Sequence, residues 1–152
     1  MGIKVFDSNK DYVKIRHVQG SFAKLVVWPG VGSKNCCFIV TTAKSGQSSI
    51  VHTHEGSEDV FMITKGKATV VDVDSGREYK VKEGDVVFVE PGTNHMVKYE
   101  DEYVSVGCIA PPDPKQLERI ISETTSTSKK RSCQHLTQKR LFLSGRTLTD
   151  KN

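Results

Sequence analysis

The chain alternates short β-rich runs with turn residues at a regular spacing, and this pattern limits the fold more than any other feature. The runs are rich in Val, Ile, Phe, Thr and Tyr, and each is followed closely by a Gly, a Pro or a cluster of acidic residues. The expected strands cover residues 22–28, 36–43, 49–54, 59–64, 67–73, 77–81, 85–89, 95–99 and 103–110. Strands that recur about every 8–12 residues between Gly and Pro turns are typical of β-sandwiches and barrels. The sequence therefore predicts an all-β domain, with a hairpin turn over residues 74–76.

A length of 152 residues with 36% hydrophobic content fits one domain with one modest core. The formal net charge of +4 is unevenly distributed along the chain. Residues 1–112 hold 13 Lys and Arg against 14 Asp and Glu, whereas residues 113–152 hold 9 against 4. The positive charge therefore belongs to the C-terminal part and not to the β-rich part, so a nucleic-acid partner is not expected.

The sequence shows neither an N-terminal apolar run of signal-peptide length nor the roughly 20 consecutive apolar residues that would span a bilayer. We therefore expect no membrane association and a cytoplasmic location. The four cysteines, Cys36, Cys37, Cys108 and Cys133, show no Cys-x-x-Cys spacing, which favours reduced thiols. Cys108 would lie within reach of Cys36 or Cys37 if their strands were neighbours.

Residues 113–152 differ in composition from the part before them. Over residues 115–123, Leu117, Ile120 and Ile121 share one side of a helical pattern, which predicts a short helix. Residues 122–132 are rich in Ser, Thr and basic residues, and such a composition buries too little apolar surface to offset the loss of chain entropy. We therefore expect a β-barrel domain over residues 1–112, followed over residues 113–152 by a short helix and a flexible, disordered basic extension.

A His-x-His pair, His52 and His54, falls in the expected strand over residues 49–54. Residues two apart on a strand project from the same face, so both imidazoles can converge on one metal ion. Acidic residues follow at Glu58 and Asp59, and His95 follows a Pro-Gly turn about forty residues later. Imidazole and carboxylate ligands suit Fe, Mn, Ni, Zn or Cu better than calcium. The sequence therefore predicts a divalent transition metal held by three histidines and an acidic residue.

The segments HTHEGSEDVFMITKG and EGDVVFVEPGTNH, which carry these residues, resemble the two motifs of the cupin superfamily. The first motif is matched by His52, His54, the acidic pair at 58–59 and Gly66, and the second by Gly84, Gly92 and His95. The resemblance covers about residues 30–110 and implies a single cupin barrel, also described as a jelly roll or double-stranded β-helix. Pro91 stands one position later than the family's usual proline.

The resemblance leaves two candidates for the carboxylate ligand. Counting back from Gly66, the family's glutamate position falls on Asp59, whereas counting forward from His54 it falls on Glu58. Neighbours on a strand point to opposite faces, so only one of the two normally coordinates. Asp59 would share an inward face with Phe61, while Glu58 would need a β-bulge, and both stay open.

Tyr99 stands where an asparagine often follows the histidine in the resembled family. His95, Val97 and Tyr99 alternate onto one face of an expected strand, which would aim the Tyr99 hydroxyl towards the metal cavity. Tyr99 is therefore a candidate catalytic residue, as a substrate ligand or proton donor. The alternative is a tyrosine whose ring lies in the core and whose hydroxyl bonds at the barrel mouth.

The resemblance implies a metal-dependent enzyme, with a dioxygenase acting on a small organic molecule as the first expectation. Isomerase or lyase chemistry on a sugar or keto acid follows closely, and a non-catalytic cupin that binds or senses a small molecule is the alternative. The expected partner is accordingly a small-molecule ligand or substrate. The family also implies a homodimer formed through edge strands.

Overall fold

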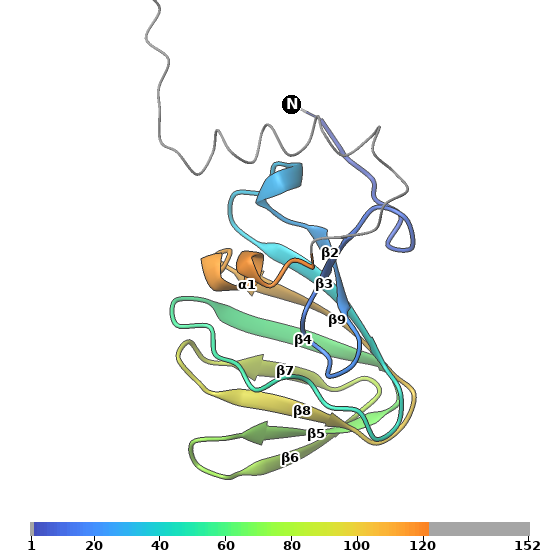
Figure 1. Ribbon diagram of the computed structural model, residues 1–152, viewed down its shortest axis with the longest axis vertical. Coiled ribbons are helices and arrows are strands. Elements are labelled where there is room, and N and C mark those ends of the chain that lie inside the picture. The colour runs from blue at the N-terminus through green and yellow to red at the C-terminus, as the bar shows by residue number, and fades with distance from the viewer. Residues whose placement is uncertain (1, 122–152) are drawn as a thin grey trace, which may run out of the picture. The chain divides into compact units, whose positions relative to one another are not determined.

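A computed structural model describes residues 2–121, which form nine strands in two antiparallel sheets (Figure 1). The strands are β1 (Val13–Ile15), β2 (Ala23–Val27), β3 (Cys37–Ala43), β4 (Glu58–Lys65), β5 (Lys67–Asp72), β6 (Glu78–Lys82), β7 (Val86–Val89), β8 (His95–Tyr99) and β9 (Tyr103–Ala110). One sheet has the order β1-β2-β3-β9-β4-β7 and the other the order β6-β5-β8. A 3-10 turn, η1 (Pro29–Val31), and one helix, α1 (Pro114–Glu118), complete the described elements. The predicted all-β fold with a short C-terminal helix is confirmed.

The segment between β3 and β4 widens the smaller sheet beside β8. Isolated bridges pair Ser48 with Lys98 and His52 with His95, and a further bridge pairs Val18 with Ser49. The expected strand over residues 49–54 therefore exists only as separate bridges and not as a continuous strand. The chain is still extended enough for alternate side chains to face opposite ways, because His52 and His54 are buried while Val51 is exposed.

Glycines close two of the turns that set the register of the strands. The predicted hairpin turn joins β5 to β6, with Gly76 at a φ of 70° and Asp72 accepting a hydrogen bond from the Ser75 hydroxyl. Gly66, at a φ of 84°, separates β4 from β5, and a Cβ there would collide with the backbone carbonyl of Glu102. The glycine that ends the first motif is therefore required by the close approach of the chain.

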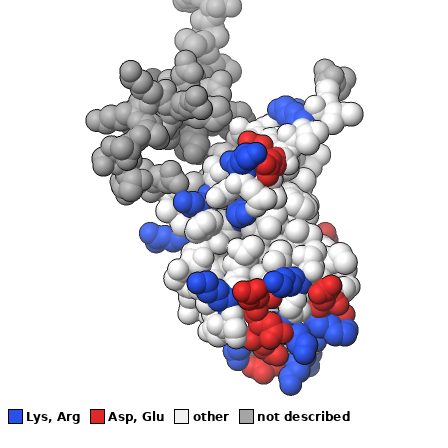
Figure 2. All heavy atoms as spheres, turned by 90° about the vertical axis from the view of Figure 1, so that its right-hand side faces the viewer, with Lys and Arg blue, Asp and Glu red and all other residues white. Residues whose placement is uncertain are grey.

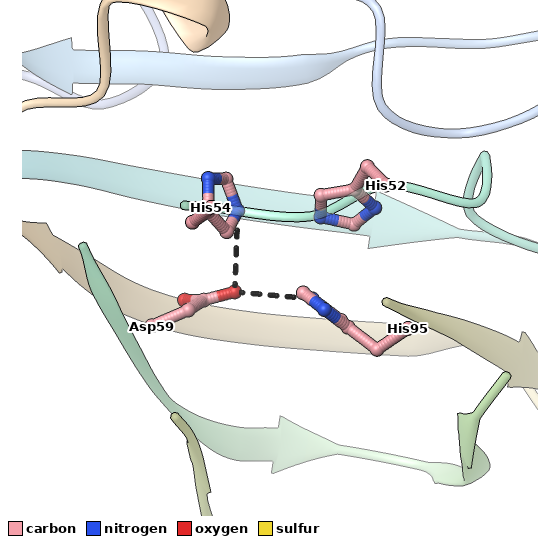
Figure 3. Close-up of side chains that lie close together, drawn as sticks. All are labelled: His52, His54, Asp59 and His95. Atoms are coloured by element: carbon pink, nitrogen blue, oxygen red, sulfur yellow. Dashed lines mark ion pairs between the residues drawn. The ribbon is translucent and has the colours of Figure 1, made fainter. Parts of the chain in front are cut away.

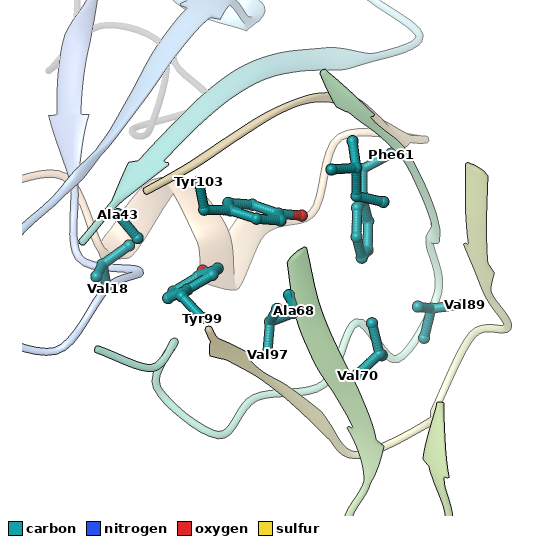
Figure 4. Packing of buried hydrophobic residues seen from close by; sticks show 10 residues of the cluster. Val18, Ala43, Phe61, Ala68, Val70, Val89, Val97, Tyr99 and Tyr103 are labelled. Atoms are coloured by element: carbon teal, nitrogen blue, oxygen red, sulfur yellow. The ribbon is translucent and has the colours of Figure 1, made fainter. Parts of the chain in front are cut away.

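The larger apolar cluster lies inside the barrel (Figure 4). It consists of Val18, Ala43, Phe61, Ile63, Ala68, Val70, Val89, Val97, Tyr99 and Tyr103. A second cluster gathers residues from β1, β2, β3 and β9, with Leu25 and Cys37 fully buried. Burying one such side chain contributes roughly 1.5–3 kcal/mol, so these two clusters supply most of the driving force for closing the sheets.

The helix α1 contacts the first strand through backbone hydrogen bonds. Asp113 caps its start by accepting from the Lys115 N–H, and Pro114 occupies the first turn. Beyond its end, the Arg16 N–H donates to the Arg119 carbonyl at 2.9 Å, and the Ile121 N–H donates to the Lys14 carbonyl at 2.9 Å. The helix is shorter than the expected range of residues 115–123.

The expected disordered extension over residues 122–132, and with it Cys133, lies outside the described residues. The domain boundary at residue 112 stays a prediction. The described cysteines, Cys36, Cys37 and Cys108, are free thiols, and β3 and β9 are neighbours in which Phe38 pairs with Cys108.

Charges of both signs lie side by side at the end of the molecule that carries β5 and β6, on the face shown in Figure 2. Two ion pairs there join Lys98 to Glu78 at 2.7 Å and Lys82 to Asp85 at 3.2 Å. Within residues 2–121, no helix is both long and apolar enough to cross a bilayer.

Candidate metal centre

Four predicted ligands meet inside the barrel, where the two motifs approach each other (Figure 3). His52 and His54 come from the segment beside β8, Asp59 is the second residue of β4, and His95 is the first residue of β8. One potential ligand atom from each lies within 4.8 Å of the others. All four side chains are buried, with exposed fractions between 2% and 8%. This group of four residues is called the metal cluster below.

Each imidazole of the metal cluster is oriented by a hydrogen bond at Nδ1. His52 Nδ1 lies 2.8 Å from the Ile50 carbonyl oxygen, and His95 Nδ1 lies 3.0 Å from the Thr93 carbonyl oxygen. His54 Nδ1 lies 2.7 Å from Asp113 Oδ2. Because these partners only accept, each Nδ1 donates, so each Nε2 carries a free lone pair. Such hydrogen bonds fix the ring orientation in metal sites and raise the basicity of the ligand.

The Nε2 atoms and the Asp59 carboxylate face one another. His54 Nε2 lies 3.9 Å and His95 Nε2 lies 3.7 Å from Asp59 Oδ2, and Figure 3 shows Asp59 reaching between the two rings. Burial lowers the pKa of His52 from 6.5 to about 2, and also lowers the pKa of His54 despite the neighbouring Asp113. The neutral imidazole is the form that binds a metal.

The cluster fits a transition metal on its own chemistry. His52 Nε2 and His54 Nε2 are buried without any hydrogen-bond partner in the described part of the chain. A buried polar atom left unpaired costs about 1–3 kcal/mol, and a metal ion would satisfy both atoms at once. Three nitrogen donors and one carboxylate suit a first-row metal, but they do not distinguish among Fe, Mn, Ni, Zn and Cu.

The structure separates the two candidate carboxylates. Asp59 is 8% exposed and belongs to the metal cluster, whereas Glu58 is exposed on the opposite face of β4. No β-bulge is recorded at this point, because Glu58 pairs with Ala110 and Asp59 with Ile109 in continuous register. Glu58 therefore points away from the three histidines.

The comparisons with known proteins agree with the observed fold. Residues 38–107 match the family model of the cupin domain. The matched stretch therefore has the cupin fold. Both the resemblance seen in the two motifs and the barrel fold are thereby confirmed. No curated protein matches the chain in sequence.

Three solved structures illustrate the range of proteins that share this fold. A predicted oxalate decarboxylase from Thermotoga maritima is 20% identical, with 71% of this chain and 98% of that chain covered and a TM-score of 0.58. An RmlC-like cupin protein from Desulfovibrio desulfuricans is 24% identical, covering 74% and 92% at a TM-score of 0.53. The polyketide cyclase RemF from Streptomyces resistomycificus is 15% identical, covering 84% and 89% at a TM-score of 0.56. Likeness at these identities shows the fold alone.

A small cavity adjoins the metal cluster in the cupin barrel. It offers about 30 Å³ to the centre of a water molecule, and its walls include Phe61, Val97 and Ile109. Tyr99 also lines it, is 3% exposed, and has its ring centroid 4.7 Å from that of Tyr103 with the two rings tilted by 42°. The predicted alternation of His95, Val97 and Tyr99 onto the inner face is therefore present. Burial raises the pKa of Tyr99 well above its usual value, so its hydroxyl keeps its proton. A catalytic role for Tyr99 stays a prediction.

Three residues around the cupin site were missed from the sequence. His17 lines the cavity with its ring 5.0 Å from that of His52, and burial lowers its pKa to about 4. Asp113 orients His54, and Gln116 lines the cavity from α1. A signal existed only for Asp113, because an Asp before a Pro at the start of a helix is a typical cap.

Proposed function

We propose that this cupin is a metal-dependent enzyme of dioxygenase type, acting on a small organic molecule in the barrel cavity. One observation carries the proposal: three imidazoles, each held by a hydrogen bond at Nδ1, turn their Nε2 atoms towards one buried carboxylate. Structural zinc sites are closed by four ligands, whereas catalytic metals of five or six coordination keep positions open for substrate. The metal cluster offers four donor atoms. On a metal ion with five or six coordination positions, one or two positions would stay free for substrate.

The residues of the chain have separable tasks in this proposal. His52, His54, His95 and Asp59 would hold the ion, and a bound redox-active metal would supply the Lewis acidity and one-electron chemistry that side chains lack. Phe61, Val97 and Ile109 give the cavity an apolar wall, which would strengthen electrostatic interactions inside it. Tyr99 retains its proton and is available to donate a hydrogen bond to an oxygen of the substrate.

The experiment that tests the proposal begins with elemental analysis of protein purified without added metal. The protein is then loaded anaerobically with Fe²⁺, and oxygen uptake is followed with a panel of diketones, thiols and keto sugars. We expect about one metal per chain and substrate-dependent uptake, both lost in His52→Ala. Absence of stoichiometric metal, together with unchanged thermal stability of His52→Ala, would refute the proposal.

A specific observation favours a second candidate, a non-catalytic cupin that binds or senses a small molecule. Among the residues that line the cavity, Asp59 is the only carboxylate and there is no Lys or Arg, so acid-base groups outside the cluster are few. In this case ligands from the same panel would raise the melting temperature of the metal-loaded protein through binding to the native state. Oxygen uptake and turnover would stay at background. Isomerase or lyase activity on a sugar or keto acid would appear instead as product formation without oxygen uptake.

The homodimer and the cytoplasmic location stay predictions from the sequence. Sedimentation of the purified protein tests the first, and fractionation of cells that express the chain tests the second.

A further inference from the structure

One buried polar group at the cavity has no task in the metal cluster. Gln116 projects from α1, is 2% exposed and lines the cavity. Its Oε1 atom has no hydrogen-bond partner among residues 2–121. Leaving a buried acceptor unpaired costs about 1–3 kcal/mol, so a molecule bound in the cavity would gain a hydrogen bond at this atom.

The position of Gln116 is fixed relative to the metal cluster. Asp113 accepts from the Lys115 N–H with Oδ1 and from His54 with Oδ2, so one carboxylate joins α1 to a predicted metal ligand. The Gln116 N–H in turn donates to the Asp113 carbonyl at 3.1 Å. The backbone of Gln116 is therefore linked to His54 through Asp113, and the Gln116 side chain lines the same cavity as the four residues of the metal cluster.

The charges near the cavity favour a monoanion. Asp59 and Asp113 are the two carboxylates of this group, and the partly buried Arg119 interacts electrostatically with both. The exposed Lys115 also interacts with Asp113, but solvent screens its charge, so it is left out of the count. With a divalent cation added, the net charge of this group is +1, and a single negative charge on the ligand would neutralise it. No Lys or Arg lines the cavity around Gln116, so a second negative charge would lack a partner.

The size of the cavity limits the ligand further. A water molecule needs about 10–15 Å³ of centre-accessible volume. The 30 Å³ present therefore admits a ligand of only a few heavy atoms unless the walls move.

We propose that the cavity binds a small monocarboxylate that carries a hydroxyl group, as 2-hydroxy acids do. The carboxylate faces the metal cluster, and the hydroxyl donates a hydrogen bond to Gln116 Oε1. The inference rests on the proposed metal function and names the substrate class for that same site. Gln116 is then the residue that distinguishes a hydroxyl group from a methyl group of the same size.

The test compares glycolate with propionate, which replaces the hydroxyl of glycolate by a methyl group. Protein loaded with one equivalent of Zn²⁺ is titrated with each acid by calorimetry. We expect glycolate to bind about tenfold more tightly, because one hydrogen bond to a buried acceptor is worth about 1–1.5 kcal/mol. In Gln116→Met, which keeps the length of the side chain, the two acids should bind within about twofold of each other.

Lys115→Met is the matched control, because this neighbouring residue is exposed and its ammonium group forms an ion pair with Glu55 at the surface. It should keep the tenfold preference. Tyr103→Phe removes a buried hydroxyl from the wall of the same cavity, and it too should keep the preference.

Equal affinity of the wild-type protein for glycolate and propionate would overturn the inference. A preference that survives in Gln116→Met, or is lost only in Tyr103→Phe, would overturn the assignment to Gln116. Zinc content measured before titration separates failure of the metal proposal from failure of this inference alone. A protein that does not bind zinc refutes both. Zinc binding without acid discrimination refutes the inference alone.

Discussion

The metal cluster and the apolar cluster of the barrel are buried to the same degree, yet their side chains contribute to stability in opposite ways. Ile63 and Ala68 are almost fully buried among other apolar side chains, and each such burial stabilises the fold. His52 and His54 are nearly as buried, but each leaves one nitrogen unpaired in the metal-free protein. In this comparison the apolar half of the interior holds the barrel together, whereas the metal half holds buried nitrogen atoms that an ion would satisfy.

Loss of a predicted ligand from the metal half should give the largest effect. His95→Ala removes one of four donors, and metal-site energies of about 10–16 kcal/mol for four ligands imply a loss of roughly 3–4 kcal/mol, or several hundred-fold in affinity. Competition with a chromophoric chelator measures the affinity. Adding metal should no longer raise the melting temperature of the variant. A variant that still holds one equivalent tightly would remove His95 from the cluster.

Loss of packing in the apolar half should cost almost as much, but in stability and not in metal affinity. Ile63→Ala deletes a fully buried side chain, and we expect about 3 kcal/mol off the free energy of unfolding in urea. Met62→Ala is the matched control, because Met62 is 43% exposed on the opposite face of β4 and should lose less than about 1 kcal/mol. If metal affinity fell in Ile63→Ala as it does in His95→Ala, the two halves would not be separate.

The orientation of one imidazole can be weakened without removing a ligand. Asp113→Asn keeps a side-chain oxygen that can cap α1 but removes the charge beside His54, so metal affinity should fall about 10–100-fold. Glu55→Gln removes an exposed carboxylate that pairs with Lys115 and should leave affinity unchanged. Equal affinity in Asp113→Asn and wild type would mean that the contact to His54 does not prepare the site.

The pH dependence of the metal-free protein follows from the same comparison. Burial lowers the pKa of His52 from 6.5 to about 2, so below pH 6.5 the unfolded chain binds more protons than the folded one. Stability should therefore be constant above about pH 7 and fall as the pH drops from 6.5 towards 2, by at most about 1.4 kcal/mol per pH unit for each such group. Urea unfolding at pH 7.5, 6 and 5 measures the slope. A flat profile would show that His52 is not buried in its neutral form.

The order of the strands along the chain could be predicted because alternation and turn chemistry are local. The hairpin turn at Gly76 and the inward face of Phe61 both follow from patterns a few residues long. The three-residue strand β1 was missed, since so short a run has no detectable period. Residues 49–54 were expected to form a strand but make only isolated bridges, and a pattern of single residues does not show whether a partner strand continues beside them.

The candidate site also contains residues that local patterns predict and residues that only tertiary contacts bring in. His52, His54 and His95 were found because they belong to the two motifs. The family resemblance indicated that the two motifs lie side by side in the barrel, which residue spacing alone does not show. Asp113 and Gln116 lie at the site because the start of α1 is placed beside it. His17 lies there because its neighbour Val18 pairs with Ser49. No local sequence pattern indicates such tertiary contacts, so the residues that surround the metal cluster could not be predicted from the sequence.

The smallest expected effect separates the two faces of β4 at neighbouring positions. Glu58→Gln changes an exposed side chain and should alter neither metal affinity nor stability by more than about 0.5 kcal/mol. Asp59→Asn makes the same chemical change one residue later, inside the metal cluster, and should lower metal affinity as much as loss of an imidazole. Both variants keep their volume, so packing cannot account for a difference between them. If Glu58→Gln proved the damaging change, strand β4 would have to turn its other face inward, and Phe61 and Ile63 would leave the core together with Asp59.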